Sequence, residues 1–194
     1  MSWRDMFLIM MLGLTLTSCS APEKMGSKHN EINSQPVAVG QQNPNRQAGS
    51  WTMVHYIMAF EGKNLDKAMA GLLSAGESSV GKKDFGGPLC LLKKTSSKDN
   101  LFTRIKEGVN FGPEWKIIRM SIKNNIVDFY ATMEDPQAGR AEMTITGILT
   151  DKSTDLVIIT DSYQPAPGKG HIHTVMKQEN SRIGECIADQ DVWQ

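Results

Sequence analysis

The sequence predicts a mainly β protein of the α+β class, built as a curved antiparallel β-sheet meander of about six or seven strands with one or two covering helices. Apolar and polar residues alternate along residues 115–163, and turn signals separate the alternating runs. Helical spacing of apolar residues occurs only near residues 64–76 and 97–107. The sheet is therefore expected to dominate the fold.

The chain begins with a secretory signal pattern, a short apolar run over residues 6–16 that Arg4 precedes. About eleven apolar residues are too few for a bilayer core that needs about twenty, which argues against a permanent transmembrane helix. Leu16-Thr17-Ser18-Cys19 then resembles the lipobox of bacterial lipoproteins. That resemblance implies cleavage before Cys19 and acylation of its thiol and new amino group, with palmitate among the chains. The alternative is an ordinary cleaved signal peptide that leaves Cys19 as a thiol.

Residues 1–18 are thus predicted to be a lipoprotein signal peptide. Residues 19–48 are rich in Ser, Pro, Gln, Asn and Gly and are expected to form a lipidated N-terminus and flexible tether. Residues 49–187 form the expected single antiparallel β domain, and residues 188–194 form a tail. Because Ser20 follows the cysteine, the lipoprotein resemblance implies transfer to the outer membrane, facing the periplasm of a Gram-negative cell envelope.

The composition gives no sign of a nucleic-acid partner and limits how the cysteines can pair. Lys plus Arg equal Asp plus Glu at 21 each, so the chain has no net charge and carries no basic footprint for nucleic acid. Three cysteines are present, and lipidation of Cys19 leaves Cys90 and Cys186. In an oxidising periplasm this pair is most simply one disulfide. Two reduced buried thiols, or a redox site lacking C-x-x-C spacing, are the alternatives.

The first half of the domain is predicted to hold one strand and two helices. Residues 51–60 are apolar and aromatic, as a first strand requires. Asn64 or Asp66 can cap a helix that Gly76 is expected to stop. Residues 76–83 match G-x-x-x-x-G-K, but Lys83 replaces the required Ser or Thr, so a solvated turn is expected instead of a phosphate loop. After a break at residues 86–88 come an apolar segment at 89–92 and a second helix near 97–107.

The second half is predicted to be strands only. Asn124-Asn125 is a turn signal between two of them. Alternation predicts that one face carries Ile118, Met120 and Ile122, then Val127, Phe129, Ala131 and Met133, then Ala141, Met143, Ile145, Gly147 and Leu149. Leu156 to Ile159 is expected to be a buried strand, and residues 171–178 a last strand before an extended segment that ends at Cys186.

These features together resemble an uncharacterised Gram-negative exported family, the domain of unknown function 3617. The resemblance spans about residues 49–187 and rests on the opening Gly49-Ser50-Trp51, Cys90, a strand with a central Gly147 and the closing Arg182-Ile-Gly-Glu-Cys186. Members usually carry further cysteines in the middle of the domain, which this chain lacks; if those pair with each other, their absence supports a bond between Cys90 and Cys186. The family brings no assigned activity, substrate or cofactor.

The best constellation for chemistry is His171-Ile172-His173. A strand period of two aims both imidazoles at one face, where a shared metal could bridge them, and Met176 would favour copper. Two histidines on the exposed face of an edge strand are the simpler interpretation, because no third ligand is identifiable. No nucleophile elbow and no free cysteine remain for covalent catalysis.

The sequence therefore predicts no catalytic residue and no cofactor. Its leading functional interpretation is a lipid-anchored envelope protein with a non-enzymatic binding or structural role. The bound partner would be a hydrophobic small molecule held between sheet and helix, or another envelope protein. The alternative is a periplasmic metal-binding protein or hydrolase that uses His171 and His173.

Overall fold

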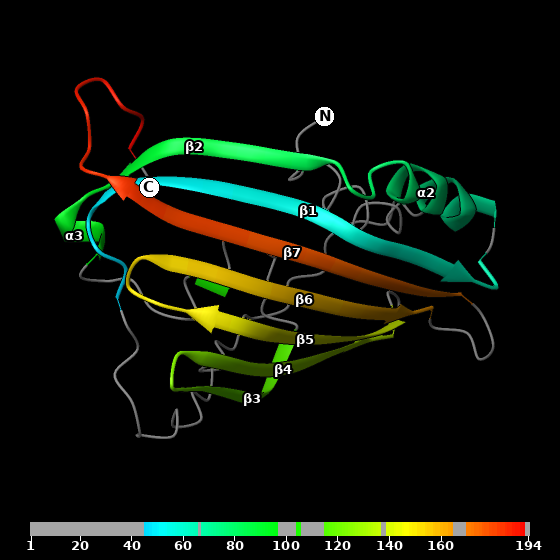
Figure 1. Cartoon of the computed structure of the whole chain (residues 1–194). Coiled ribbons are helices and arrows are strands. Elements are labelled where there is room, and N and C mark those ends of the chain that lie inside the picture. The colour runs from blue at the N-terminus through cyan, green and yellow to red at the C-terminus, as the bar shows by residue number, and fades with distance from the viewer. Residues whose placement is uncertain are drawn as a thin grey trace, which may run out of the picture. The chain divides into compact units, whose positions relative to one another are not determined.

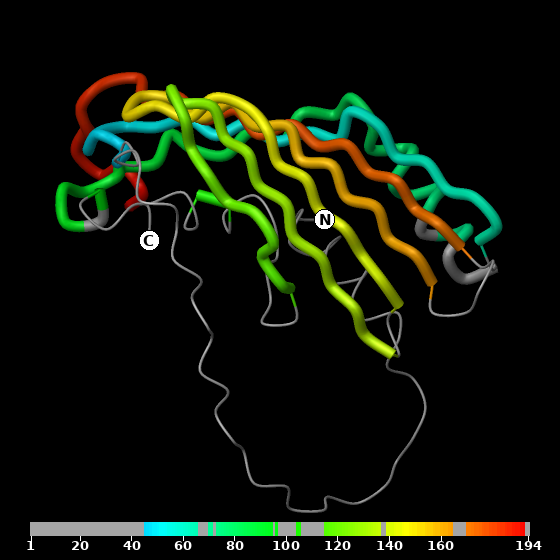
Figure 2. Tube along the Cα trace, turned by 90° about the horizontal axis from the view of Figure 1, so that it is seen from below, coloured from blue at the N-terminus to red at the C-terminus, as the bar shows by residue number. Residues whose placement is uncertain are grey.

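Seven antiparallel strands form one open sheet in the order β2-β1-β7-β6-β5-β4-β3 (Figure 1). The computed structural model describes residues 45–65, 67–96, 104–105, 115–136, 139–164 and 170–192, all within the second of two units of the chain, residues 40–194. The expected β class and number of strands are confirmed. The sheet is twisted and curved, as the tube in Figure 2 makes visible.

The last five strands form the expected meander, in which each strand pairs with the next one along the chain. They are β3 (Trp115–Lys123), β4 (Ile126–Asp135), β5 (Gly139–Leu149), β6 (Ser153–Tyr163) and β7 (His171–Gly184). Asn124 and Asn125 both adopt positive φ, at 51° and 65°, which matches the twist of a tight hairpin. The predicted turn between β3 and β4 is therefore confirmed.

The strands β1 and β2 continue the sheet on the other side of β7. β1 (Gly49–Lys63) pairs with β7 along its whole length, and β2 (Lys83–Leu91) pairs with β1. The helix α2 (Lys67–Glu77) joins these two strands, and the short α3 (Lys93–Ser96) follows β2. β7 thus lies inside the sheet and not at an edge. The edge-strand interpretation of residues 171–178 was wrong because alternation reports which face a side chain takes, not which strand lies beside it.

Residues that pair directly across antiparallel strands share a face, so the register defines two faces. The inner face holds the core, which the following buried residues of β4 to β7 represent: Val127, Phe129, Ala131, Met133, Ala141, Met143, Ile145, Leu149, Leu156, Ile158, Ile172 and Met176. The inward residues predicted for β4 and β5 are therefore confirmed. The outer face carries the alternate residues, most of them partly exposed.

Two departures from simple alternation have local causes. A bulge between Ile117 and Arg119 shifts the register of β3, so Ile117 takes the inner position opposite Ala131 and Ile118 is 48% exposed. The prediction that Ile118 faces the core was therefore wrong. In β6 only Leu156 and Ile158 of the expected buried run are fully buried, since the residues between them lie on the outer face.

The helix α2 packs against the far end of β1. A methyl group at Gly76 would overlap the ring of Phe60, so this glycine permits close contact between helix and strand. Gly76 was expected to stop the helix, but it lies within the last turn of α2. Of the second predicted helix, residues 97–107, only Arg104 and Ile105 are described; both are helical and fully buried. Among the described residues, no helix is both long and apolar enough to span a membrane.

A disulfide joins Cys90 of β2 to Cys186, two residues beyond β7, with a Cα–Cα distance of 5.3 Å. The predicted pairing is confirmed. The tail adds to the same edge, because the backbone N–H of Cys90 donates to the carbonyl oxygen of Asp191 at 2.7 Å. Close to this corner on β1, where Trp51 pairs with Leu89, the indole N–H of Trp51 donates to the carbonyl oxygen of Gln47 at 3.0 Å. The proposed signal peptide and most of the tether lie outside the described residues.

Candidate functional sites on the two faces of the sheet

The outer face brings the two predicted histidines together around a carboxylate. In the register of β6 and β7, Tyr163 pairs with His171 and Asp161 pairs with His173. The Oδ1 atom of Asp161 lies 2.8 Å from Nε2 of His171 and 2.9 Å from Nδ1 of His173. The expectation that both imidazoles share one face is confirmed. Asp161 was not predicted, because nothing in the local sequence places a residue ten positions earlier beside them.

The hydrogen bonds from the two histidines keep Asp161 ionised. Burial alone would raise the pKa of Asp161, but the hydrogen bonds from His173 and His171 outweigh that effect and hold its pKa below the usual value. Asp161 is therefore an anion at neutral pH and only accepts hydrogen bonds. Nε2 of His171 and Nδ1 of His173 are therefore the donors in these two hydrogen bonds.

Neighbouring side chains extend the cluster across the outer face. The ring of Tyr163 stacks on His171 with centroids 4.6 Å apart, and the guanidinium of Arg140 lies 4.7 Å from the Tyr163 ring centroid. Arg140 also pairs with Glu142 at 3.0 Å. Among the described residues, no group of three or more His, Cys, Asp or Glu side chains is arranged to hold a metal ion. The cluster is thus a hydrogen-bonded and stacked array.

The inner face contains a polar patch where a packed core would be apolar. Gln178 and Asn180 of β7 project from the inner face beside Leu156 and Thr154 of β6, their cross-strand neighbours. Gln178 is fully buried and Asn180 is 1% exposed. Nevertheless, the amide nitrogen and oxygen of both side chains, like the hydroxyl of Thr154, have no hydrogen-bond partner in the described part of the chain. We call Thr154, Gln178 and Asn180 the inner polar patch.

Buried amides without partners are uncommon, since leaving a buried donor or acceptor unpaired costs about 1–3 kcal/mol. The inner polar patch has apolar neighbours: Met53 of β1 lies opposite Asn180, while Leu149 of β5 lies opposite Thr154. Alternation from Ile172 carried the signal, because it places positions 178 and 180 on the inner face. The predicted last strand ended at Gln178, so Asn180 fell outside it, and the surroundings of both side chains depend on neighbouring strands.

Comparisons with family models, curated proteins and solved structures gave no match. The resemblance to the domain of unknown function 3617 therefore stays a prediction. What the protein does has to be argued from the two clusters themselves.

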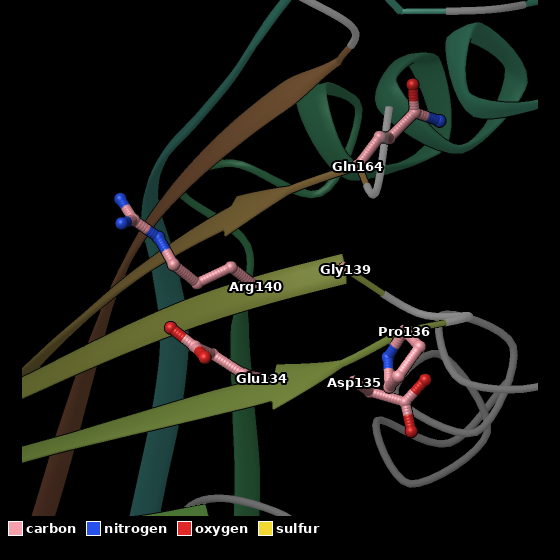
Figure 3. A pocket seen from close by; sticks show the side chains of 6 residues that line it. All are labelled: Glu134, Asp135, Pro136, Gly139, Arg140 and Gln164. Atoms are coloured by element: carbon pink, nitrogen blue, oxygen red, sulfur yellow. The ribbon is translucent and has the colours of Figure 1, made fainter. Parts of the chain in front are cut away.

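A third feature is an open recess of about 450 Å³ where β4 ends and β5 begins (Figure 3). Its lining consists of Glu134, Asp135, Pro136, Gly139, Arg140 and Gln164. Arg140 is already engaged by Glu142 and Tyr163, and Asp135 and Gln164 also make contacts of their own. The recess has similar polar and apolar lining and does not gather groups of one chemical kind, so it gives no reason to assign a ligand.

Proposed function

We propose that this protein is a lipid-anchored component of the bacterial cell envelope whose β domain binds an amphipathic small molecule on its inner face. The observation that carries the proposal is the pair of buried amides of Gln178 and Asn180, which have no hydrogen-bond partner among the residues that the structure describes. A ligand that pairs with them would offset the cost of their burial. A partly apolar ligand also suits the surrounding Met, Leu and Ile side chains, because Met lines adaptable binding surfaces as well as cores.

Membrane attachment would come from the Leu16-Thr17-Ser18-Cys19 motif. Acylation of Cys19 would anchor the chain in the outer membrane with the domain facing the periplasm, since more than one acyl chain gives stable anchoring. Replacing Cys19 with Ala should move the protein from the detergent phase to the aqueous phase in Triton X-114 partitioning. A variant that stays in the detergent phase would rule out this anchor.

Binding can be tested on the full protein purified from its own membranes. Native mass spectrometry should detect a co-purifying small molecule on the wild type and lose it in the double variant Gln178→Met, Asn180→Leu. A wild-type protein that carries nothing, and that takes up nothing when incubated with a total lipid extract of the same membranes, would refute the proposal. Another envelope protein as the partner would instead appear as a larger complex.

The second candidate is a metal-binding protein or hydrolase that uses His171 and His173. One observation favours it, namely that Asp161 adds a third group that could serve as a ligand. It ranks second because the three side chains already bond to one another and are not arranged around a metal position. Zinc or copper should raise the melting temperature of the wild type, but not that of His171→Ala. No shift in the wild type would end this candidate.

A further inference from the structure

The unpaired atoms of the inner polar patch define what a ligand must offer. Gln178 and Asn180 each present one NH2 donor and one carbonyl acceptor, and all four groups lack partners in the described part of the chain. A carboxylate or phosphate only accepts hydrogen bonds, so it would leave both carbonyl oxygens unpaired. An ammonium group only donates, so it would leave both NH2 groups unpaired. A head group that pairs with the whole patch must both donate and accept.

The charges around the inner polar patch also favour an uncharged head group. Its inner-face neighbours in the register are Met53 and His55 on β1 and Leu149 on β5, and none of them is a permanent ion. Burial lowers the pKa of His55 more than Asp84 raises it, which leaves the imidazole neutral at neutral pH. The two buried arginines of the described residues are both engaged: Arg104 donates to the carbonyl oxygen of Thr150 at 2.9 Å, and the guanidinium of Arg46 lies 5.8 Å from the Trp51 ring centroid. Within the described part of the chain, an ionic head group would therefore be buried without a free counter-ion, which is costly.

An apolar strip continues from the patch along β6 and β7. Met176 and Ile158 form the next cross-strand pair after Gln178 and Leu156, and both are at most 1% exposed. The pair Thr160 and Thr174 ends the strip. At about 3.4 Å per residue, Gln178 to Thr174 spans about 14 Å. Because Met176 and Ile158 are buried, an acyl chain that packs against them would replace contacts that they already make.

We infer that the inner face selects an uncharged amphipath, with an amide-like or hydroxyl-bearing head at Gln178 and Asn180 and an acyl chain over Met176 and Ile158. This inference rests on the proposed binding function and adds the class of ligand. Monoacyl lipids with an amide or glycerol head belong to this class. Fatty-acid anions and cationic surfactants do not.

Three probes that differ only in the head group test the inference: dodecanamide, dodecanoate and dodecyltrimethylammonium. Their affinities for the full protein are measured by isothermal titration calorimetry at neutral pH. Dodecanamide should bind at least about tenfold more tightly than either ion, which corresponds to one good hydrogen bond. Gln178→Met and Asn180→Leu should each reduce dodecanamide affinity about tenfold and remove the preference.

Gln190→Met is the matched control, because the Gln190 amide donates to Ser50 Oγ at 2.7 Å and accepts from the backbone N–H of Ile187 at 3.1 Å. This variant should keep the wild-type preference. If dodecanoate binds as tightly as dodecanamide, or if the two patch variants keep full dodecanamide affinity, the head-group inference is overturned while binding stands. If none of the three probes binds but the protein still takes up a molecule from the total lipid extract, the inference is overturned while the proposed function stands; if the extract gives nothing either, both fail.

Discussion

Replacing the buried amides of the inner polar patch with apolar side chains of similar size should stabilise the ligand-free protein. Gln178→Met and Asn180→Leu each remove two polar atoms that have no partner in the described part of the chain, at a fully or almost fully buried position. Most core substitutions lower stability, so an increase would be unusual and informative. The expected sign follows from the cost of burying a polar atom without a partner.

The magnitude can be worked from the same atoms. A buried unsatisfied polar group costs about 1–3 kcal/mol, and an apolar residue of similar shape removes that cost. Each variant should therefore gain about 1–3 kcal/mol in the free energy of unfolding. For a domain of this size, about 2–4 °C in melting temperature accompanies each kcal/mol, so a rise of about 2–12 °C is expected. Because the two side chains are neighbours on one face, the double variant need not show the sum.

Urea unfolding and calorimetry would measure the effect on protein refolded without lipid, since a retained ligand would stabilise the wild type selectively. Gln190→Met again serves as the control, and loss of its paired amide should lower stability by about 0.5–1.5 kcal/mol. If both patch variants lose stability as the control does, the amides have partners within the protein. The inner polar patch would then offer no unpaired groups to a ligand.

Three further outcomes are expected. Replacing Cys90 and Cys186 with Ser should lower stability by about 4–5 kcal/mol, because the bond closes a long loop, with a sequence separation of 96 residues, and an unchanged urea midpoint would contradict this. Asp161→Asn should lower the free energy of unfolding by about 1–3 kcal/mol at neutral pH. Because the folded-state pKa of Asp161 is lowered, the difference between variant and wild type should vanish as pH falls below about 3.9. A difference that persists in stronger acid would refute the assignment. The wild type should lose stability as pH falls from about 6.5 to 5, because the lowered pKa of His55 makes the unfolded chain bind the proton first. His55→Gln should weaken this loss. Identical pH profiles for variant and wild type would count against a buried neutral His55.

Much of the fold could be predicted from local pattern. Alternation gave the inward residues of β4 and β5, the Asn124-Asn125 turn was recognisable from its residue type, and assigning Cys19 to lipid left a single cysteine pair. These features depend on nearest neighbours or on counting. The bulge at Ile117 depends on how β3 pairs with β4, and the strand itself carries no Gly or Pro to mark it.

The site was harder to predict because it depends on which strands are adjacent. His171 and His173 were correctly placed on one face, but their partner Asp161 follows only from the β6–β7 register. The local sequence also could not show that β7 lies between β1 and β6, because β1 and β7 are more than a hundred residues apart in the chain. Gln178 was assigned to the correct strand, but its lack of hydrogen-bond partners in the described part of the chain depends on which side chains of β1 and β6 lie beside it.

The position of β7 gives the inner polar patch its weight. An unpaired amide on an edge strand could reach water through a small local opening, whereas Gln178 and Asn180 have β1 on one side and β6 on the other. The disulfide from β2 to the end of β7 also restrains separation of β1 from β7. A Leu or Met at either position would suit the alternation and remove the cost of burial. Stability of the sheet therefore does not explain these amides, whereas the proposed recognition of a ligand would.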